Sequence, residues 1–300
     1  MASTASNGQS ALVPPKVAAG AAPPQGLLEA AVAATMPRNA AACTEYARFE
    51  PWRYNPTLTR LATGEVLIAG GQTQDGDALR DVNIFDPATK TLRTVASMHS
   101  ERSWHRAALT GDGRVLVSGL GMPVSGGKLS VEVYDVKSDR WTIVGSVDAV
   151  TEPIVAALPS GNVLVAGGLL WRSNWSTQAY VFDYKKNTLV QIAPMPEGAV
   201  GDHVASLTDG RIGIAQDSSL STFGDVMCKR CSGIIFKENF GWARGDRRLK
   251  AAVDASPLRQ AQRGELSLDD GTTLLAGGDD KETSSRIRSC PTKELLRPAQ

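Results

Sequence analysis

The stretch Leu61-Ala-Thr-Gly-Glu-Val-Leu-Ile-Ala-Gly-Gly71 decides the fold of this 300-residue chain, because it is the first clear copy of an internal repeat. It has an apolar run that follows a glycine-containing turn and ends in two glycines. Related copies begin at Leu109, Leu158, Leu207 and Leu268. Aligned on Ala69, Ser118, Ala166, Ala215 and Ala276, the copies are separated by steps of 49, 48, 49 and 61 residues. A period of this length, held over successive copies, indicates a repeat architecture.

Further strand patterns accompany each copy at the same spacing. One alternates in polarity and ends at an aspartate, in residues 82–86, 131–135 and 179–183. Another follows it in residues 92–96, 141–144 and 189–193, and a short one precedes the later copies in residues 104–109, 154–158 and 203–207. Asp86, Asp135 and Asp183 suit the turns that come next, because an aspartate carboxylate can accept hydrogen bonds from backbone N–H groups two residues later. Each unit is therefore predicted to hold four short antiparallel strands.

The composition is that of a globular chain without a dominant charge. Hydrophobic residues make up 42% and charged residues 21%, so the chain can bury a large core. Because 32 Lys and Arg stand against 31 Asp and Glu, no excess positive charge is present to attract a phosphate backbone or an anionic lipid surface. The chain also lacks an apolar run of about eighteen residues, the length that a membrane-spanning helix needs. Neither nucleic acid nor a membrane is expected as a partner.

The order of these motifs resembles the kelch repeat. The likeness is greatest to the Asp-Gly-Arg-Val-Leu-Val-Ala-Gly-Gly variant of bacterial kelch proteins and galactose-oxidase-like propellers, and it covers residues 57–217 well and 265–280 in part. The resemblance implies an all-β fold, a kelch-type β-propeller in which each repeat forms one blade. Packing supports it, because a four-stranded unit leaves apolar faces bare until neighbours cover both sides. Since three units are complete, the expectation is four or five blades, or an incomplete ring.

The glycine pairs of the repeats are expected to have a structural role. Gly70-Gly71, Gly167-Gly168 and Gly277-Gly278 each follow an apolar strand. Glycine in such a place usually marks a positive φ or a close approach of two backbones. We therefore assign these glycines to backbone geometry rather than to contact with a ligand.

The predicted organisation has four parts. Residues 1–35 are rich in alanine, proline, glycine and serine, which predicts a disordered arm. Its lack of acidic residues before Glu29 leaves a plastid-type transit peptide open, whereas a secretory signal is not indicated. Residues 36–217 are kelch repeats, residues 218–265 a diverged blade or an insertion, and residues 266–300 a partial last repeat and tail. Low order is expected over residues 1–30 and about 225–262.

Four cysteines are too few for a disulfide framework and fit a reducing compartment such as the cytoplasm. Cys228 and Cys231 have the spacing of zinc ligands, but a structural zinc ion needs two more ligands. The other thiols are Cys43 and Cys290, both distant in the sequence. We therefore favour a surface turn at this Cys-x-x-Cys and expect neither a metal nor a cofactor.

Arg102-Ser-Trp-His105, with the nearby Asp112-Gly-Arg, resembles the stretch that supplies a copper-binding histidine in galactose oxidase. The chain matches neither the second histidine, nor the equatorial tyrosine, nor the tyrosine–cysteine crosslink that such an enzyme needs. We therefore predict no catalytic residues and retain Arg102, Trp104 and His105 as candidate binding residues.

Trp171, Arg172 and Trp175 are the main candidate binding residues. They follow Gly167-Gly168 directly, in the loop where repeat one has the small polar residues 72–77. Paired tryptophans with an arginine suit a contact surface for a protein, or alternatively for a carbohydrate. A loop folded onto its own blade is the competing interpretation. The predicted function is a non-catalytic kelch-repeat interaction module that mediates protein–protein binding; the alternative is a galactose-oxidase-like or carbohydrate-active enzyme fragment.

Overall fold

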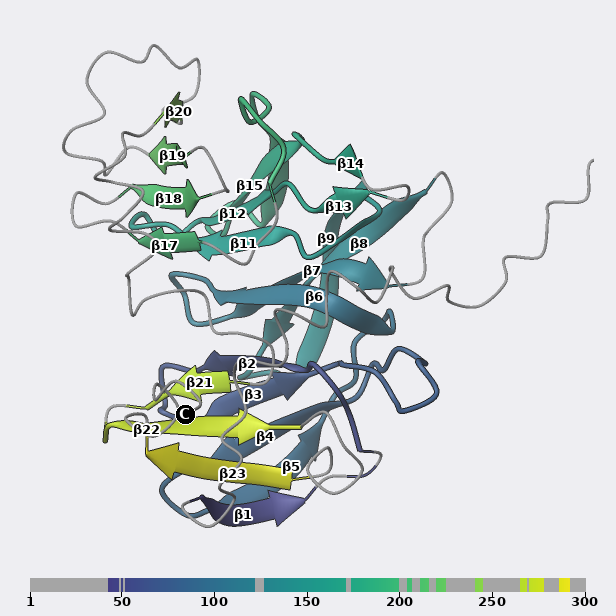
Figure 1. The fold of residues 1–300 in the computed structure, drawn as a ribbon, viewed down its shortest axis with the longest axis vertical. Coiled ribbons are helices and arrows are strands. Elements are labelled where there is room, and N and C mark those ends of the chain that lie inside the picture. Colours follow the sequence, from purple (N-terminus) through teal and green to yellow (C-terminus); the bar gives the residue numbers. More distant parts are fainter. Residues whose placement is uncertain are drawn as a thin grey trace, which may run out of the picture. The chain divides into compact units, whose positions relative to one another are not determined.

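The computed structural model describes residues 43–48, 50, 52–121, 127–170, 174–199, 204–206, 211–215, 220–224, 241–244, 265–268, 270–277 and 286–291. All of them belong to one unit, Pro37–Arg297. Within these ranges the regular elements are strands, arranged in five four-stranded antiparallel sheets and one small three-stranded sheet (Figure 1). This arrangement confirms the all-β, kelch-type fold.

Each four-stranded sheet is one blade, and its strands are hydrogen-bonded in the order given. Blade one consists of β2 (Thr57–Arg60), β3 (Val66–Ala69), β4 (Val82–Asp86) and β5 (Thr91–Val95). Blade two consists of β6 (Arg102–Leu109), β7 (Val115–Gly121), β8 (Lys128–Asp135) and β9 (Arg140–Asp148). Blade three consists of β11 (Ile154–Ala157), β12 (Val163–Ala166), β15 (Ala179–Asp183) and β16 (Thr188–Gln191). Blade four consists of β17 (Val204–Ser206), β18 (Ile212–Ala215), β19 (Leu220–Gly224) and β20 (Gly241–Arg244).

Blade five joins the two ends of the described chain. Its strands are β21 (Glu265–Ser267), β22 (Thr272–Ala276), β23 (Arg286–Pro291) and the N-terminal β1 (Thr44–Arg48). A disulfide between Cys43 and Cys290 fastens β1 to β23. β1 is the edge strand of this blade, next to β23.

The disulfide corrects the expectation drawn from the cysteine count. Cys43 and Cys290 are 247 residues apart in the sequence, yet pairing of β1 with β23 brings their Cα atoms within 4.3 Å. Disulfides persist mainly in oxidising compartments. The bond therefore does not fit the reducing, cytoplasmic setting that so few cysteines suggested.

The apolar middle strands explain how the blades hold together. β3 and β12 are buried along their whole length, because each blade packs its two faces against neighbouring blades. Separate apolar clusters join blade one to two, two to three, three to four, and five to one. The first strands also meet one another, since β6 contacts both β2 and β11 and β2 contacts β21.

The turn chemistry is as predicted. The carboxylates of Asp86, Asp135 and Asp183 each accept a hydrogen bond from the backbone N–H two residues later, at 2.8, 2.9 and 3.0 Å. The hydrogen bond from Lys137 to Asp135, with a further one from Ser138, holds the pKa of Asp135 below its usual value. These repeated turns set the register between the third and fourth strands of each of these blades.

The described glycines of these pairs have the positive φ that was expected, namely Gly70, Gly71, Gly167, Gly168 and Gly277, whereas Gly278 lies outside the described residues. Gly167 has φ of +61°, and a Cβ built there would lie 2.3 Å from the carbonyl oxygen of Ala199. Gly70 has a similar environment. Its φ is +59°, and a Cβ built there would lie 2.7 Å from the carbonyl oxygen of Arg102. A side chain at either position would push the next blade away.

We expect Gly167→Ala to lower the free energy of unfolding by about 2 kcal/mol more than Gly64→Ala, because only Gly167 adds a backbone clash to the positive φ. Gly64 is a matched control, with φ of +89° and no atom within 4 Å of a built Cβ. Urea unfolding of both variants measures the difference. Equal losses would show that the close packing of blades three and four does not depend on this glycine.

The segments for which low order was expected fall mainly outside the described residues. These are residues 1–30, 225–240 and 245–262, whereas Gly241–Arg244 forms β20, paired with β19. In the part of the chain that is described, no helix is long and apolar enough to cross a membrane.

Candidate functional site

Arg102 is placed in the interior rather than on a binding surface. Its guanidinium donates to the carbonyl oxygens of Gly119 and Ser130, at 2.8 and 2.6 Å, and to Oε1 of Glu132 at 2.7 Å. Both side chains of the ion pair are fully buried. Burial acts to raise the pKa of Glu132, but the charge and hydrogen bond of Arg102 and the hydrogen bonds from His99 outweigh it, so this pKa lies below its usual value. The pair holds β6 to β7 and β8 within blade two.

His105 is also internal. Its side chain is 1% exposed, and Nε2 lies 3.0 Å from the hydroxyl of Thr57 in the first strand of blade one. The residue therefore links the first strands of blades one and two. In the described ranges, no group of three or more His, Cys, Asp or Glu is placed to hold a metal ion.

Trp104, between these two buried residues, is only partly buried, and the strand is irregular here. The register of β6 against β7 shifts between Arg102 and His105, and Trp104 has φ of +55°. A positive φ is unusual for a bulky residue and is found where surrounding contacts hold it in place. The Trp104 indole N–H donates to the side-chain oxygen of Gln72 at 3.2 Å, and the Trp104 carbonyl accepts from the N–H of Glu152 at 2.9 Å.

The same backbone feature recurs with the period of the repeat. Asn55, Trp104 and Glu152 have φ of +49°, +55° and +53°. Asn55 and Glu152 lie two residues before β2 and β11, and Trp104 is the third residue of β6. They are separated by 49 and 48 residues. The backbone therefore has the same conformation at the equivalent position of three blades, and each blade carries a different side chain there. The sequence did not reveal this position, because asparagine, tryptophan and glutamate share no chemical pattern.

The loop after Gly167-Gly168 forms a small sheet of its own. β13 (Leu169–Leu170) lies between β10 (Val150–Thr151) and β14 (Asn174–Trp175). Leu169 pairs with both Thr151 and Trp175. The Trp175 side chain is 49% exposed, although Gly198 lies close against its backbone and Cβ. This tryptophan is therefore held in place and still open to solvent.

A series of contacts connects Trp104 to Trp175. The side-chain oxygen of Gln72 accepts a hydrogen bond from the Trp104 indole, and the Trp104 carbonyl accepts one from the N–H of Glu152. Thr151, which precedes Glu152, pairs with Leu169 in the small sheet. Leu169 pairs in turn with Trp175. We call the surface made by Gln72, Trp104, Glu152, Leu169 and Trp175 the loop face. The structure thus brings together two of the residues that the sequence proposed separately.

The other candidates lie outside the described residues. These are Trp171, Arg172, Cys228 and Cys231.

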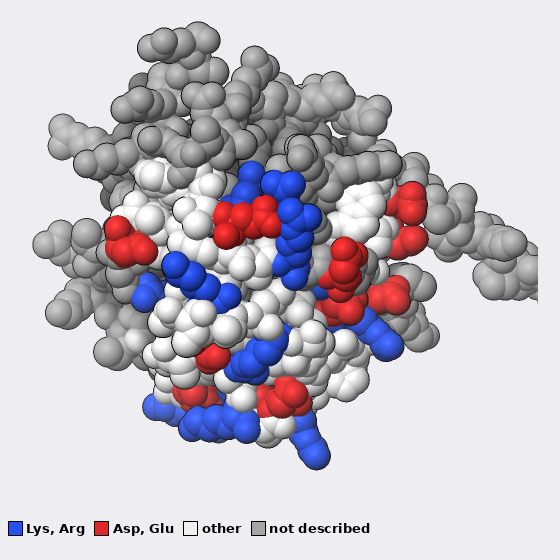
Figure 2. Space-filling model, turned by 90° about the horizontal axis from the view of Figure 1, so that it is seen from below, with Lys and Arg blue, Asp and Glu red and all other residues white. Residues whose placement is uncertain are grey.

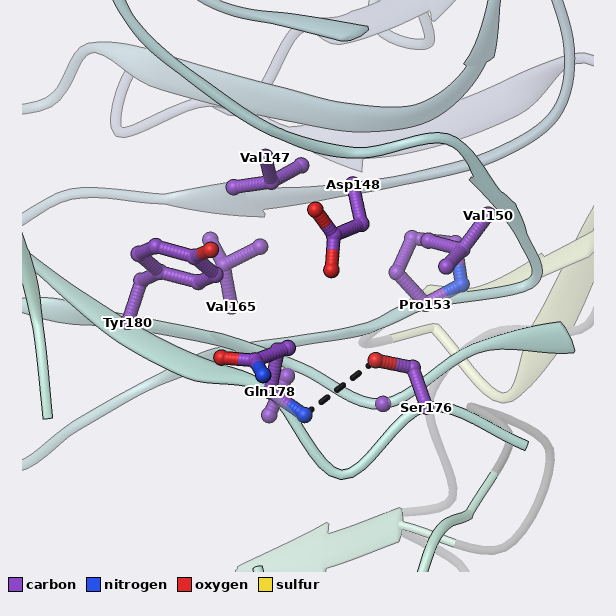
Figure 3. Close-up of a pocket in the computed structure, with 10 residues that line it drawn as sticks. Val147, Asp148, Val150, Pro153, Val165, Ser176, Gln178 and Tyr180 are labelled. Atoms are coloured by element: carbon purple, nitrogen blue, oxygen red, sulfur yellow. Dashed lines mark hydrogen bonds between the residues drawn. The ribbon is translucent and has the colours of Figure 1, made fainter. Parts of the chain in front are cut away.

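A narrow pocket lies next to the loop face, between blades two and three. It was not expected from the sequence. Ten residues line it, namely Val147, Asp148, Val150, Pro153, Val165, Ala166, Gly167, Ser176, Gln178 and Tyr180. In Figure 3 the carboxylate of Asp148 points into the space bounded by Tyr180 on one side and by Ser176 and Gln178 on the other. Burial and the charge of Asp148 raise the pKa of Tyr180, so its hydroxyl stays protonated at neutral pH.

The surface charge shows no field of one sign on the face drawn in Figure 2. Lys and Arg alternate there with Asp and Glu. Elsewhere in the described residues, charges of opposite sign are paired across short distances, as in Arg93 with Glu65 at 3.1 Å and Arg114 with Asp112 at 2.9 Å. On this face, then, recognition would depend on shape and on individual side chains more than on long-range attraction.

Comparison with known proteins found no matching family model. Human Kelch-like protein 34 is 28% identical over 160 residues, which is 47% of this chain and 24% of that protein. Zebrafish (Danio rerio) Kelch-like protein 15 is 28% identical over 149 residues, which is 42% of this chain and 24% of that protein. The match thus spans about a quarter of the length of each relative.

Among solved structures, one titled "Structure of YjhT" covers 79% of this chain and 80% of its own, with 12% identity and a TM-score of 0.45. The assignment itself depends on the repeat, the sheets and the two sequence relatives. Three complete repeat units, five four-stranded antiparallel sheets and similarity to two kelch-like proteins support a kelch-repeat β-propeller.

Proposed function

We propose that the chain is an interaction module that acts by binding a protein partner on the loop face. The observation that carries this proposal is the 49% exposure of Trp175 on a sheet that is hydrogen-bonded to its neighbours. Tryptophan is among the residues that contribute most to binding energy, and a rigid one loses little conformational entropy when it is covered. A surface of this kind favours recognition over chemistry.

The extent of the loop face favours a protein over a carbohydrate. It includes the half-buried Gln72 of blade one, Trp104 of blade two and Leu169 next to blade three. Apolar and aromatic groups alternate here with Gln72 and Glu152, as in the mixed surfaces that proteins use to bind one another. The kelch resemblance supports an interaction module as well.

We expect Trp175→Ala to weaken binding of the partner by about 2 kcal/mol while the unfolding transition changes little, because an exposed aromatic anchor contributes to the complex more than to the fold. The matched control is Ile143→Ala in β9, since Ile143 is 52% exposed and away from the loop face in the sheet order.

The partner is first identified by replacing Trp175, and separately Ile143, with a photo-crosslinking phenylalanine and exposing native extract to light. A protein captured only from position 175 is then purified, and its affinity for both alanine variants is measured by calorimetry. A strongly destabilised Trp175→Ala variant would show that the indole covers the blade. Equal affinities of the two variants would exclude the loop face as the binding surface.

A further inference from the structure

The strand connections of blades one to three are divided between two ends. Because neighbouring strands are antiparallel, the connections of strand one to two and of strand three to four lie at one end. The connections of strand two to three, and of each blade to the next, lie at the other. The first end, the turn side, is residues 61–65, 86–90, 110–114, 135–139, 158–162 and 183–187. The second, the loop side, is the described part of 52–55, 70–81, 96–101, 119–128, 148–153, 167–178 and 192–199.

On the turn side, the acidic side chains already have partners within the protein. The aspartates that end β4, β8 and β15 accept hydrogen bonds from backbone N–H groups of their own turns. Glu65 pairs with Arg93, and Asp112 pairs with Arg114. These carboxylates therefore serve the fold.

On the loop side, most of the charge is acidic. The buried cations are balanced inside the fold, Arg102 by the carboxylate of Glu132 and Arg53 by the charge of Asp81. The remaining acidic side chains of this side are Asp75, Asp77, Glu101, Asp148, Glu152 and Glu197, and the basic ones are Arg80 and Lys128. The described part of the loop side therefore has an excess of negative charge.

Three of these carboxylates are exposed close to Trp104. Asp75, Asp77 and Glu101 are open to solvent, and none of them forms an ion pair within the described residues. Asp75 and Asp77 belong to the loop that follows Gln72, whose side chain accepts the hydrogen bond of the Trp104 indole. Glu101 directly precedes β6, which contains Trp104. A partner that covers Trp104 would therefore meet these charges.

The acidic character extends to Trp175. Glu197 adjoins Gly198, and a Cβ built at Gly198 would lie 2.7 Å from the Cβ of Trp175. Lys128 lies 3.7 Å from the Asp148 carboxylate, but both side chains are more than a third exposed, so this pair offsets little of the charge. Carboxylates thus lie near both tryptophans of the loop face.

We propose that the loop face binds a basic segment of the protein partner, in which lysine or arginine residues flank an apolar side chain that covers Trp175. The inference depends on the proposed function for the use of this face, and adds the charge of what is bound. Opposite charges across an interface speed association and disfavour partners of the wrong sign. The carboxylates are spread over three blades and, in the described ranges, form no group placed to hold a metal ion, so the face suits an extended segment.

The preference for charge is tested with a phage-displayed library of random peptides, which does not require the partner. Peptides are selected on the wild-type protein, and those that also bind Trp175→Ala are removed, so the remaining peptides bind through this tryptophan. We expect them to contain more Lys and Arg, and less Asp and Glu, than the unselected library. Selected peptides that are neutral or acidic would overturn the proposal.

Two charge variants of one loop test whether its carboxylates are responsible. The most enriched peptide is synthesised and titrated by calorimetry. Asp75→Lys/Asp77→Lys is expected to weaken binding about tenfold in low salt, and the difference should shrink in about 1 M NaCl, where the Debye length is about 3 Å. Arg80→Glu should strengthen binding. The side chains are exposed, and Asp77 bonds to Thr73 through its backbone, so the fold is retained.

Lys137→Glu on the turn side is the matched control, because it changes the net charge as much as Arg80→Glu does. Lys137 is exposed, and it contacts Asp135 through its backbone N–H. We expect this variant to bind the peptide as the wild type does. Equal effects of Lys137→Glu and Arg80→Glu, or unchanged affinity of both loop variants, would contradict the assignment to the loop side.

The outcomes separate this inference from the proposed function. If Trp175-dependent peptides are recovered but lack basic residues, the loop face stands and the basic segment is wrong. If no selected peptide depends on Trp175, the loop face is wrong and this inference is wrong with it.

Discussion

Removal of the disulfide between Cys43 and Cys290 is expected to lower the free energy of unfolding by about 5 kcal/mol. The bond closes a loop of 247 residues, so it restricts the unfolded chain strongly, and the entropy of the unfolded state rises when it is absent. In the folded protein its loss leaves β1 held to β23 by backbone pairing, by the ion pair between Glu45 and Arg286 and by apolar packing around Ile287. Blade five should therefore open first.

The experiment uses Cys→Ala substitutions at both positions, with Cys228→Ala/Cys231→Ala as the matched pair. Urea unfolding of each double variant, with and without reductant, separates this bond from other effects of thiols. The 43/290 variant is expected to be insensitive to reductant and as unstable as the reduced wild type. A reduced wild type that unfolds at the same urea concentration as the oxidised protein would show that the fifth blade does not need the bond.

Glu132→Ala is expected to destabilise the protein by about 3–5 kcal/mol, because it leaves the buried charge of Arg102 without its partner. Glu132 also accepts hydrogen bonds from the backbone N–H groups of His99 and Ser100, at 2.7 and 3.2 Å, so the substitution loosens the link between blades one and two. Glu65→Ala is the matched control, since its ion pair with Arg93 is at the surface and should contribute less than about 1 kcal/mol.

A double variant, Arg102→Leu/Glu132→Leu, distinguishes an uncompensated charge from lost packing. It should be more stable than Glu132→Ala, because no charge is left buried. Equal instability of the two would show that shape rather than charge explains the loss. Chemical unfolding monitored by tryptophan fluorescence gives both values.

The pH dependence follows from the same carboxylate. Because the folded pKa of Glu132 lies below its usual value, the group stabilises the protein at pH values above its unfolded pKa of about 4.3. That contribution is lost as the pH falls through the folded pKa. Between about pH 5 and pH 3, the wild type should therefore lose more stability than Glu132→Gln, and parallel curves would contradict this role of Glu132.

The repeat made most of the fold predictable from the sequence. Val66–Ala69, Val163–Ala166 and the aspartate turns after β4, β8 and β15 were all recognisable, because burial between two neighbours demands apolar runs and tight turns demand aspartate or glycine. These are local requirements that each copy of the repeat meets by itself. Exposure of part of the 169–175 loop to solvent was one of two alternatives that the residues left open.

Tertiary structure alone decided what each candidate residue does. Arg102, Trp104 and His105 look like one motif in the sequence, but the strand has a register shift and a positive φ here, and Trp104 is partly exposed while the other two are buried. Likewise, Cys43 and Cys290 meet only because blade five is built from both ends of the described chain.

Sequence by itself therefore determined the all-β repeat, the turns, and the glycines that let blades approach, because each depends on residues close together along the chain. It could not determine the fifth blade, the disulfide or the loop face. Those depend on contacts such as that between Trp104 and Glu152, or between Asp148 and Tyr180, which lie in different blades. Such contacts exist only after separate sheets have packed together, and no local pattern records which side chains will then face each other.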